Sequence, residues 1–386
     1  MIFAPALNTN TLKIAVNTRF LLPGQLEGFG WYTHEIVSRM VKNHPEDQFF
    51  FFFDRPYDSS FVYGQNVTPM VLFPPARHPF LFDWWFEWSV PRALKRCGAD
   101  VFFSPDSMCS LRADIPTVMT CHDLVPLHFP EQVERRHRAY LQRKLPLWFE
   151  RANHLLTVSE FVKNDMVTTC GIAPEKITAV YNGYRDAFLP LSAAQIGEVR
   201  SRYSSGQPYF FYAGAIHPRK NIHRLIEAFD QFRLVTGARC KLLLAGRFAW
   251  QTGEIRQAWE NARFRDDIVF PGYVGVEELP LLTGAAIAST YVSLSEGFGL
   301  PLAEAMACDV PVITSEASCL PEVAGGAALL VNPFDTASIT EGLKNIYASE
   351  ELRNSLVARG RVRRKEFSWE KAAEVVWEVV CMVDRV

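Results

Sequence analysis

The sequence lacks an excess of charge of either sign, any close pair of cysteines and any long hydrophobic run. Its 40 basic and 42 acidic residues nearly balance, so no global field favours a nucleic-acid backbone, and no nucleic-acid partner is expected. The eight cysteines are scattered, without a Cys-x-x-Cys pair or a Cys/His cluster typical of zinc, and we expect reduced thiols in the cytoplasm. Because no run of about eighteen apolar residues and no export-signal pattern occurs, neither membrane spanning nor export is expected.

The chain is long enough, and apolar enough, for two domains. It has 386 residues, of which 48% are hydrophobic and 21% charged, as in ordinary globular proteins. Short β-branched or aromatic runs alternate with helical patterns, which predicts an α/β fold of two doubly wound, Rossmann-like domains with parallel sheets. The predicted strands are 12–17, 48–54, 100–105, 117–123, 154–159 and 177–181, then 209–215, 241–245, 268–270, 289–294, 311–314 and 327–331.

The pattern loosens after Asn182-Gly183 and restarts at Tyr209, which predicts a domain boundary near residue 190. The first domain would then span 1–190 and the second 191–366. Two domains imply a cleft, and ligands of such sheets bind beyond the carboxyl ends of the strands, where glycine loops open helices.

The strongest motif is a glycine loop between a predicted strand and a predicted helix, at residues 295–306. Pro301 suits the first helical position, where a missing N–H costs little. The amides of Phe298, Gly299 and Leu300, after Gly297, are then free to bind an anion such as a phosphate.

Two carboxylates accompany this loop. Glu296 lies in the loop and Glu304 in the predicted first turn, so they approach a ligand from two directions. Carboxylates in such places suit sugar hydroxyls, which are hydrogen-bond donors. Taken singly, each is better explained structurally, Glu296 as a solvated loop residue and Glu304 as a first-turn acid that complements the helix dipole. Together with the glycine loop they favour a ligand site.

The motif Glu-Gly-Phe-Gly-Leu-Pro-x-x-Glu-Ala-Met-Ala resembles the signature of glycosyltransferase family 4. Similar family segments are Ala213-Gly214, residues 218–221, 272–274 and 320–326, and Phe367-Ser368-Trp369. The resemblance implies a GT-B fold with a nucleotide-sugar site in the central cleft and transfer that retains anomeric configuration. It also implies that a final helix, within 367–386, crosses back to the first domain.

Lys220 matches the family lysine that contacts the donor diphosphate, and cations stabilise the charge on such a leaving group. The sequence has Ala215 where the family more often has an arginine, so Arg219 is expected to substitute from another angle. The alternative for both cations is a solvated helix start. The resemblance also places Gly246, Arg247, Tyr273 and Val274 around the base and phosphates, although each segment alone is only a strand-ending turn.

In the first domain, Gly28 and Gly30 precede a helix that is predicted to begin near Trp31. They resemble the family glycine loop that faces the donor phosphates. His122, at the end of a predicted strand, matches a family histidine beside the transferred sugar, with Asp123 expected to orient it. The alternative for His122 is a hydrogen-bonded histidine at a strand end.

Together these patterns predict a hexosyltransferase that passes sugar from a nucleoside diphosphate-sugar, with GDP-mannose favoured, to a saccharide or lipid-linked saccharide. The predicted catalytic residues are Glu296, His122 and Lys220. The predicted donor-binding residues are Gly28, Gly30, Arg219, Lys220, Gly246, Arg247, Tyr273, Val274, Glu296, Gly297, Phe298, Gly299, Leu300 and Glu304. No Asp-x-Asp sequence occurs, and neither a metal nor another cofactor is expected.

Three alternatives stay open. The same fold also serves sugar-nucleotide epimerases and phosphorylases, and a catalytically silent scaffold would bind the donor without turnover. A separate question concerns the aromatic stretch 80–96, which carries basic residues at its end. It is either an amphipathic helix packed on its own domain or a peripheral contact with the inner membrane face.

Overall fold

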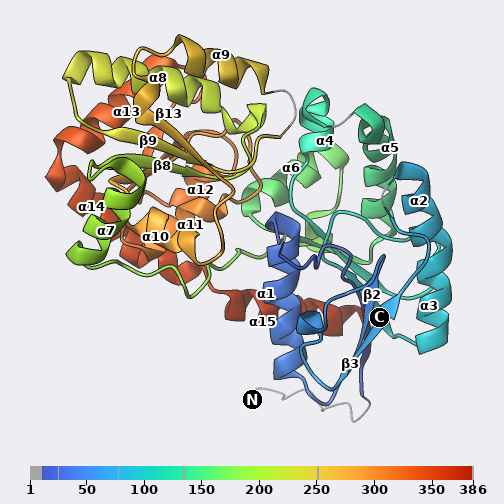
Figure 1. Ribbon diagram of the computed structural model, residues 1–386. Coiled ribbons are helices and arrows are strands. Elements are labelled where there is room, and N and C mark those ends of the chain that lie inside the picture. Colours follow the sequence, from blue (N-terminus) through green and yellow to red (C-terminus); the bar gives the residue numbers. More distant parts are fainter. Residues whose placement is uncertain (1–10, 25, 77, 134, 250–251, 385–386) are drawn as a thin grey trace. The chain divides into compact units, whose positions relative to one another are not determined.

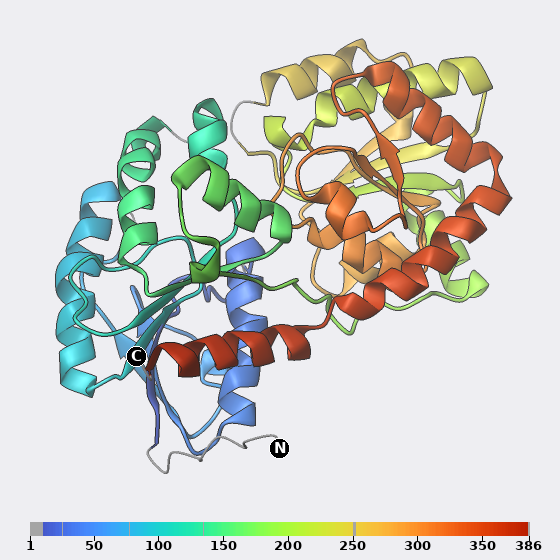
Figure 2. The ribbon, with the colours of Figure 1, turned by 180° about the vertical axis from the view of Figure 1, so that it is seen from behind.

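The computed structural model describes residues 11–384, except 25, 77, 134 and 250–251. The chain forms two compact units. Unit 1 comprises the residues up to Val158, then Val162–Val180 and the segment from Trp369 onward, and unit 2 comprises Ser159–Phe161 and Tyr181–Ser368. Each unit is a parallel sheet with helices on both faces, which confirms the predicted α/β class (Figures 1 and 2).

The sheet of unit 1 has seven strands in the order β3-β2-β1-β4-β5-β6-β7, all of them parallel. Their bounds are β1 Lys13–Asn17, β2 Gln48–Phe53, β3 Val67–Val71, β4 Val101–Ser104, β5 Thr117–Cys121, β6 His154–Thr157 and β7 Ile177–Ala179. The order reverses direction between β1 and β4, which makes their carboxyl ends the switch point of this sheet.

One strand of unit 1, β3, was not predicted from the sequence. β3 contains Pro69, which has no N–H to give to a sheet ladder and argues against a central strand. The structure places β3 at the edge of the sheet, paired only with β2, where a proline is tolerated. The core beside it is aromatic, because four of the five phenylalanines of β2 are buried.

The main helices of unit 1 are α1 Gly28–Asn43, α2 Pro79–Trp84, α3 Val90–Cys97, α4 Val125–His128, α5 Arg135–Arg151, α6 Glu160–Cys170 and α15 Trp369–Asp384. The last of them packs against α1 although more than three hundred residues separate them (Figures 1 and 2). Trp369 contacts Tyr32 with ring centroids 6.1 Å apart, and Trp377 stacks on His44 at 3.6 Å. Aromatic contacts, together with the buried alanines and valines of α15, therefore attach this helix to unit 1.

The sheet of unit 2 has six parallel strands in the order β10-β9-β8-β11-β12-β13. The strands are β8 Tyr209–Ala213, β9 Lys241–Ala245, β10 Ile268–Gly272, β11 Ala288–Tyr291, β12 Val312–Ser315 and β13 Leu329–Val331. The helices are α7 Ala193–Ser204, α8 Ile222–Thr236, α9 Gly253–Asn261, α10 Glu278–Gly284, α11 Leu300–Ala307, α12 Leu320–Ala324, α13 Thr336–Ala348 and α14 Glu350–Arg363.

The chain passes from unit 1 to unit 2 after Val180, earlier than the boundary near residue 190 that the loosened pattern predicts. The connecting segment lacks regular structure but packs on unit 2. Tyr181 lies against Phe298 and Phe367, each with ring centroids 6.0 Å away, and Leu191 lies close to Gly284. Packing rather than secondary structure therefore decides to which unit this segment belongs. Among the described residues, no helix is long and apolar enough to cross a membrane.

Candidate functional site

The switch point of unit 2 lies between β8 and β11, and the two strongest sequence motifs follow these two strands. The chain reverses its order at this pair, so the loops that leave their carboxyl ends diverge and expose a site. The loop after β8 leads through a short 3₁₀ turn, Pro218–Lys220, into α8, and the loop after β11 leads to α11. Residues 71 to 77 positions apart in the chain meet there.

Glu296 is the centre of this site. The residue is 7% exposed, and its carboxylate accepts hydrogen bonds from Lys220 Nζ at 2.5 Å and from Arg219 Nη1 at 3.1 Å. Burial by itself raises the pKa of Glu296, but Lys220 and Arg219 outweigh burial and lower that pKa to about 2. Glu296 is therefore ionised, and it holds two cations beyond the carboxyl ends of β8 and β11.

Neighbouring groups fix this ion cluster. Lys220 Nζ also donates to the Tyr291 hydroxyl at 2.7 Å, and Arg219 Nη1 donates to the Ser295 carbonyl at 2.5 Å. The backbone joins the two loops directly, because Leu294 N donates to the Arg219 carbonyl at 2.9 Å. Lys220 and Arg219 are thus held at one place, which a solvated helix start does not require.

Asn221 anchors the turn that presents these cations. It is the residue just before α8 and has φ of 60°, in the left-handed region that asparagine tolerates better than most residues. Its buried side-chain amide donates to the carbonyls of Val292, at 3.1 Å, and Pro333, at 2.7 Å. The Pro-Arg-Lys-Asn segment therefore works as a unit, in which the asparagine positions the two preceding cations.

Glycines bring three strand-ending loops of unit 2 into close contact. Gly214 and Gly246 have φ near +150°, and a Cβ on Gly246 would lie only 1.7 Å from the Gly214 carbonyl oxygen. Gly214 N donates to Ala245 O at 3.0 Å, and Gly246 N donates to Gly272 O at 2.8 Å. Only glycine allows this close approach. The packing of the loops therefore explains the glycine at position 246, whether or not it also contacts a ligand.

Arg247 and Tyr273 leave these loops side by side. The Arg247 guanidinium lies 6.0 Å from the centroid of the Tyr273 ring, and this ring is 53% exposed. Val274 follows it and is half-buried. An exposed aromatic ring next to a cation is available to stack on a planar group.

Helix α11 begins one residue earlier than the sequence predicts. Gly299, with φ of 91°, is the residue before the helix, so Leu300 comes first and Pro301 second. A Cβ on Gly299 would lie 2.8 Å from Leu320 Cδ2, which explains the glycine. Gly297 and Phe298 are buried, with the Phe298 ring packed against Phe367 at 5.5 Å.

Glu304 does not lie in the first turn of α11, contrary to the prediction. The earlier helix start puts it in the second turn, and the first turn has no acidic residue. Burial raises the pKa of Glu304 to about 7, because Arg185, whose Nη2 is 3.8 Å from Glu304 Oε1, compensates only in part. Glu304 is thus a poorly solvated carboxyl that titrates near neutral pH and not an acid that complements the helix dipole.

In unit 1, Gly28 and Gly30 are part of a helix and not of a loop before it. Helix α1 begins at Gly28, three residues before the predicted start at Trp31, with Glu27 as the preceding residue. A Cβ on Gly30 would lie 2.8 Å from the Phe20 carbonyl oxygen, so the first turn packs too closely for a larger residue. The amides of these first residues are the ones that an α-helix leaves without internal partners.

His122 follows β5 and is enclosed by aromatic rings. The ring centroids of Phe29 and Tyr32 each lie 4.7 Å from that of His122. Its Nε2 donates to the Pro105 carbonyl at 2.8 Å, and burial lowers the pKa of His122. The neutral imidazole therefore carries its proton on Nε2, which makes Nδ1 a hydrogen-bond acceptor.

The sequence suggested that Asp123 orients His122, but the structure shows no direct hydrogen bond between these two described residues. The Asp123 carboxylate instead accepts from Val125 N at 3.1 Å, at the start of α4. The Pro105 carbonyl, in the loop after β4, takes the orienting role. A backbone carbonyl has no signature in the sequence, so residue types alone could not reveal this contact.

Comparison with known proteins gives an independent view of the chain. The model of Glycosyltransferase Family 4 matches residues 27–188, and the model of Glycosyl transferases group 1 matches residues 198–363. The O-antigen chain mannosyltransferase B of Escherichia coli is 33% identical over 66% of this chain and 67% of its own length. The chain belongs to glycosyltransferase family 4.

Two further relatives of this glycosyltransferase are also mannosyltransferases. The O-antigen chain mannosyltransferase RfbU of Salmonella typhimurium is 30% identical over 62% of this chain and 64% of its own length. The serotype-specific mannosyltransferase WbdA of Escherichia coli is 28% identical over 68% of this chain, but the match spans only 33% of WbdA.

Solved structures agree on the fold. Anabaena Alr3699/HepE, in complex with UDP and glucose, superposes with a TM-score of 0.75 at 17% identity, covering 96% of this chain and all of HepE. WaaG, a glycosyltransferase involved in lipopolysaccharide biosynthesis, superposes with a TM-score of 0.74 at 16% identity, covering 95% and 99% of the two chains. The glycosyltransferase thus has the GT-B fold that the sequence predicted.

Sequence reasoning missed three groups around these sites: Tyr291, Arg185 and the Pro105 carbonyl. Tyr291 ends a strand that was predicted, and its position before the glycine loop is a usable signal for a hydroxyl near Lys220. Arg185 lies in the irregular segment after Val180, where no pattern links it to Glu304.

One further cluster has the chemistry of a cation site but lies elsewhere in the glycosyltransferase. Among the described residues, His44, Glu46 and Asp47 are the group whose ligand atoms lie within 4.8 Å of one another. They precede β2, at the amino end of the strands, whereas the ligand sites of such sheets lie at the carboxyl ends. Asp47 is already used structurally, because it accepts from Leu12 N at 2.7 Å.

Proposed function

We propose that this glycosyltransferase moves a hexosyl group, with mannose from GDP-mannose favoured, to an acceptor hydroxyl in polysaccharide, lipopolysaccharide or glycolipid assembly. The observation that carries the proposal is the cluster of Glu296, Lys220 and Arg219 at the switch point of unit 2. Two cations beside an ionised carboxylate suit a ligand with phosphates at one end and hydroxyl donors at the other. The names of the relatives support mannose as the sugar.

The cations of unit 2 supply the charge stabilisation in this proposal. Lys220 and Arg219 turn toward the donor diphosphate, whose negative charge grows as the bond between the anomeric carbon and the phosphate oxygen breaks. The amides at the start of α11 add partial positive charge. Glu296 is then free to accept hydrogen bonds from sugar hydroxyls, and Glu304 does the same from the second turn.

The stereochemical course that we propose is retention. The acceptor oxygen attacks the anomeric carbon from the side on which the diphosphate leaves, and the acceptor proton passes to an oxygen of the departing phosphate. No protein general base is assigned. His122, neutral and with Nδ1 as an acceptor, is proposed to bind a hydroxyl of the transferred sugar.

We further propose that the reaction needs no metal and takes place on the cytoplasmic side. Lys220 and Arg219 offer the positive charge that a divalent cation provides in other transferases. All eight cysteines lie in the described part of the chain and are free thiols, as in a reducing compartment. The expected acceptor is a saccharide or a lipid-linked saccharide.

The direct test combines a donor screen with product analysis. Nucleoside diphosphates and their sugars are screened by thermal shift, since a ligand that binds the folded state raises its melting temperature. The preferred donor is then incubated with saccharide acceptors, and the anomeric configuration of the product is read by NMR. An isomerised sugar without an acceptor would instead indicate an epimerase, and binding without any turnover a silent scaffold. Loss of transfer in EDTA that only manganese or magnesium restores would refute the role given to the cations.

A further inference from the structure

The aromatic stretch 80–96 has two faces in the structure. It forms α2, a π-helical turn at Trp85–Ser89 and α3, which follow one another without a break. Trp85 and Phe86 are buried in the core of unit 1, whereas Phe80, Trp84 and Trp88 are 71%, 56% and 45% exposed. The stretch therefore packs on its own domain with one face and presents large rings to solvent with the other.

The exposed rings of this stretch, together with one from the loop before it, are what we call the aromatic face: Phe80, Trp84, Trp88 and Phe73. The first three are spaced by four residues, and the rings of Trp84 and Trp88 lie 6.4 Å apart. Phe73 belongs to the preceding loop and is 81% exposed; its carbonyl accepts a hydrogen bond from Ser89 at 2.5 Å, which holds this loop against the helix. Isolated exposed rings are common in proteins, but three along one helical stretch and a fourth on the loop bound to it favour a binding surface.

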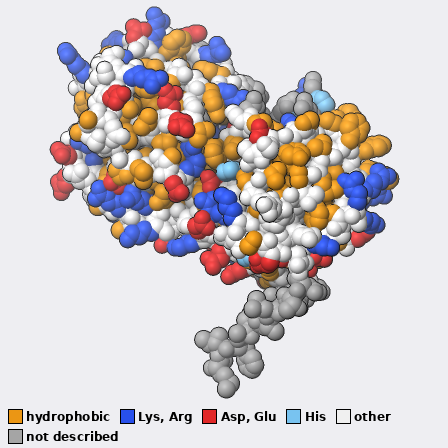
Figure 3. Space-filling view, turned by 60° about the horizontal axis from the view of Figure 1, so that its bottom comes forward, with side chains coloured by type: hydrophobic (Ala, Val, Ile, Leu, Met, Phe, Trp, Pro, Cys, Tyr) orange, Lys and Arg blue, Asp and Glu red, His pale blue; other side chains and the backbone are white. Residues whose placement is uncertain are grey.

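Arginines border the aromatic face. The guanidinium of Arg112 lies 4.4 Å, and that of Arg92 5.6 Å, from the centroid of the Trp88 ring, and both side chains are exposed. On the side drawn in Figure 3, hydrophobic side chains gather over unit 1 next to a group of Lys and Arg side chains. The border is thus cationic.

The acidic residues of the same stretch, Asp83 and Glu87, form hydrogen bonds and an ion pair within unit 1. Glu87 accepts from Leu111 N at 3.1 Å, and Asp83 accepts from the Tyr140 hydroxyl at 3.1 Å and pairs with Lys144 at 2.7 Å. Their negative charge is therefore partly compensated within unit 1. Arg92 and Arg112, by contrast, are exposed to solvent. Their described side-chain contacts are with the Trp88 ring and include no carboxylate.

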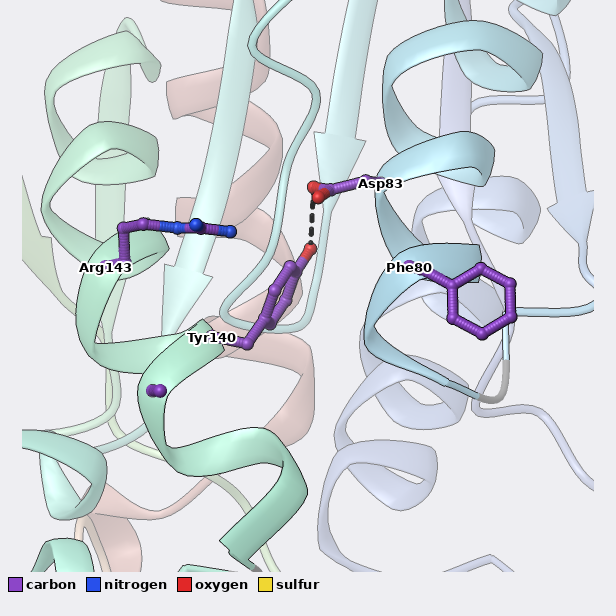
Figure 4. Close-up of a pocket in the computed structure, with 5 residues that line it drawn as sticks. Phe80, Asp83, Tyr140 and Arg143 are labelled. Carbon is purple, nitrogen blue, oxygen red and sulfur yellow. Dashed lines mark hydrogen bonds between the residues drawn. The ribbon is translucent and has the colours of Figure 1, made fainter.

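A cavity of about 300 Å³ opens beside the aromatic face, between α2 and α5. Phe80, Asp83, Ala139, Tyr140 and Arg143 line it, and Figure 4 shows Tyr140 and Arg143 of α5 on the side that faces Asp83 of α2. The surface is therefore indented, with an aromatic wall and one more arginine at the indentation.

We propose that the aromatic face is a docking surface for an anionic lipid bilayer. Phe73, Phe80, Trp84 and Trp88 enter the boundary between head groups and acyl chains, where large amphipathic rings are most stable. Arg92 and Arg112 meet the lipid phosphates, and this charge complementarity selects a bilayer with net negative charge. The inference goes beyond the proposed transfer reaction, because it names a surface of unit 1 that needs neither donor nor acceptor.

The test is co-sedimentation of the full chain with vesicles of phosphatidylcholine alone or mixed with phosphatidylglycerol. The wild-type chain is expected to bind the mixed vesicles and to be released by salt. Trp84→Ser together with Trp88→Ser should weaken binding by about tenfold or more. Arg92→Gln together with Arg112→Gln should weaken binding to the mixed vesicles by about fivefold for each arginine, without affecting the weak binding to neutral ones.

Matched controls come from unit 2, where Phe334 is 63% exposed and Arg239 is exposed. Phe334→Ser and Arg239→Gln should bind vesicles like the wild-type chain. Equal binding by all variants, or no binding by the wild-type chain, would overturn the proposal. So would an aromatic-dependent dimer in sedimentation velocity without lipid binding, which would make the face a protein interface. Thermal shift with the donor should be unchanged in every variant, so failure of this proposal leaves the transfer reaction testable by itself.

Discussion

The candidate site residues of the two units are held in place by different interactions. In unit 2, Glu296, Lys220 and Arg219 form a compact ion cluster whose charges hold one another in place. In unit 1, His122 is a neutral ring enclosed by Phe29 and Tyr32 and oriented by a backbone carbonyl.

The contrast separates two requirements of the proposed chemistry. A departing diphosphate needs full positive charges, and full charges need a counter-ion when no ligand is bound; Glu296 is placed to supply it. A sugar hydroxyl does not require a full charge: a neutral acceptor of defined direction also serves, and burial and one hydrogen bond provide it at His122. We expect substitutions in unit 2 to act through charge, and those in unit 1 through geometry.

The largest effect is expected for Glu296→Gln. It removes the carboxylate that binds Lys220 and Arg219, and the turnover number should fall by about a hundredfold to a thousandfold. The same change frees both cations, so the nucleoside diphosphate should bind at least as tightly as to the wild-type chain, as measured by calorimetry.

The control for this substitution is Glu316→Gln, at an exposed glutamate of unit 2 that should leave both quantities unchanged. Full activity of Glu296→Gln would remove Glu296 from the site. Loss of nucleotide binding together with turnover would show a structural role only.

The next largest effect is expected for Lys220→Ala. It should weaken binding of the nucleoside diphosphate by about tenfold to a hundredfold, as expected for the loss of a charged hydrogen bond. The comparison with Glu296→Gln sharpens the contrast, because Lys220→Ala is expected to weaken nucleotide binding whereas Glu296→Gln is not. Arg239→Ala, at an exposed cation of the same unit, is the control in the same titration. Unchanged affinity in Lys220→Ala would contradict the assignment of the phosphates to this cluster.

A third prediction concerns pH and Glu304. Burial raises the pKa of Glu304 from its ordinary value of 4.5 to about 7, so the folded state binds this proton more tightly than the unfolded chain. The stabilisation is fully present below pH 4.5 and is lost as the pH rises through about 7.

Glu304→Gln should remove this dependence. Relative to the wild-type chain, the variant gains about 2–3 kcal/mol in free energy of unfolding between pH 4.5 and pH 8. Urea unfolding at several pH values measures the difference, with Glu316→Gln as the reference. A constant difference between variant and wild type would mean that Glu304 titrates normally.

The smallest effect is expected in unit 1. His122→Ala should lower turnover by about tenfold, the value of one neutral hydrogen bond. Asp123→Asn keeps the orienting contact with Pro105 and should change turnover by less than His122→Ala does. A loss in Asp123→Asn as large as in His122→Ala would restore the orienting role that the sequence had suggested for Asp123.

Much of the fold could be predicted from the sequence, because alternating strand and helix patterns are local. Twelve of the thirteen strands overlap predicted ones, and the exception, β3, contains a proline that only an edge position accepts. The predicted starts of the helices were less accurate. Both α1 and α11 begin earlier than expected, since their glycines continue into the first turn or stand just before it.

The glycine loop, the two glutamates and the Pro-Arg-Lys-Asn segment were all visible in the sequence by itself, since short-range sterics and residue chemistry determine such motifs. Only the tertiary structure decided that Lys220 meets Glu296 across 76 positions, that Arg185 is the partner of Glu304, and that Pro105 orients His122. The physical reason is that strand order, and not spacing along the chain, brings these groups together. A backbone carbonyl or an arginine in an irregular segment has no pattern of its own until the sheets have formed.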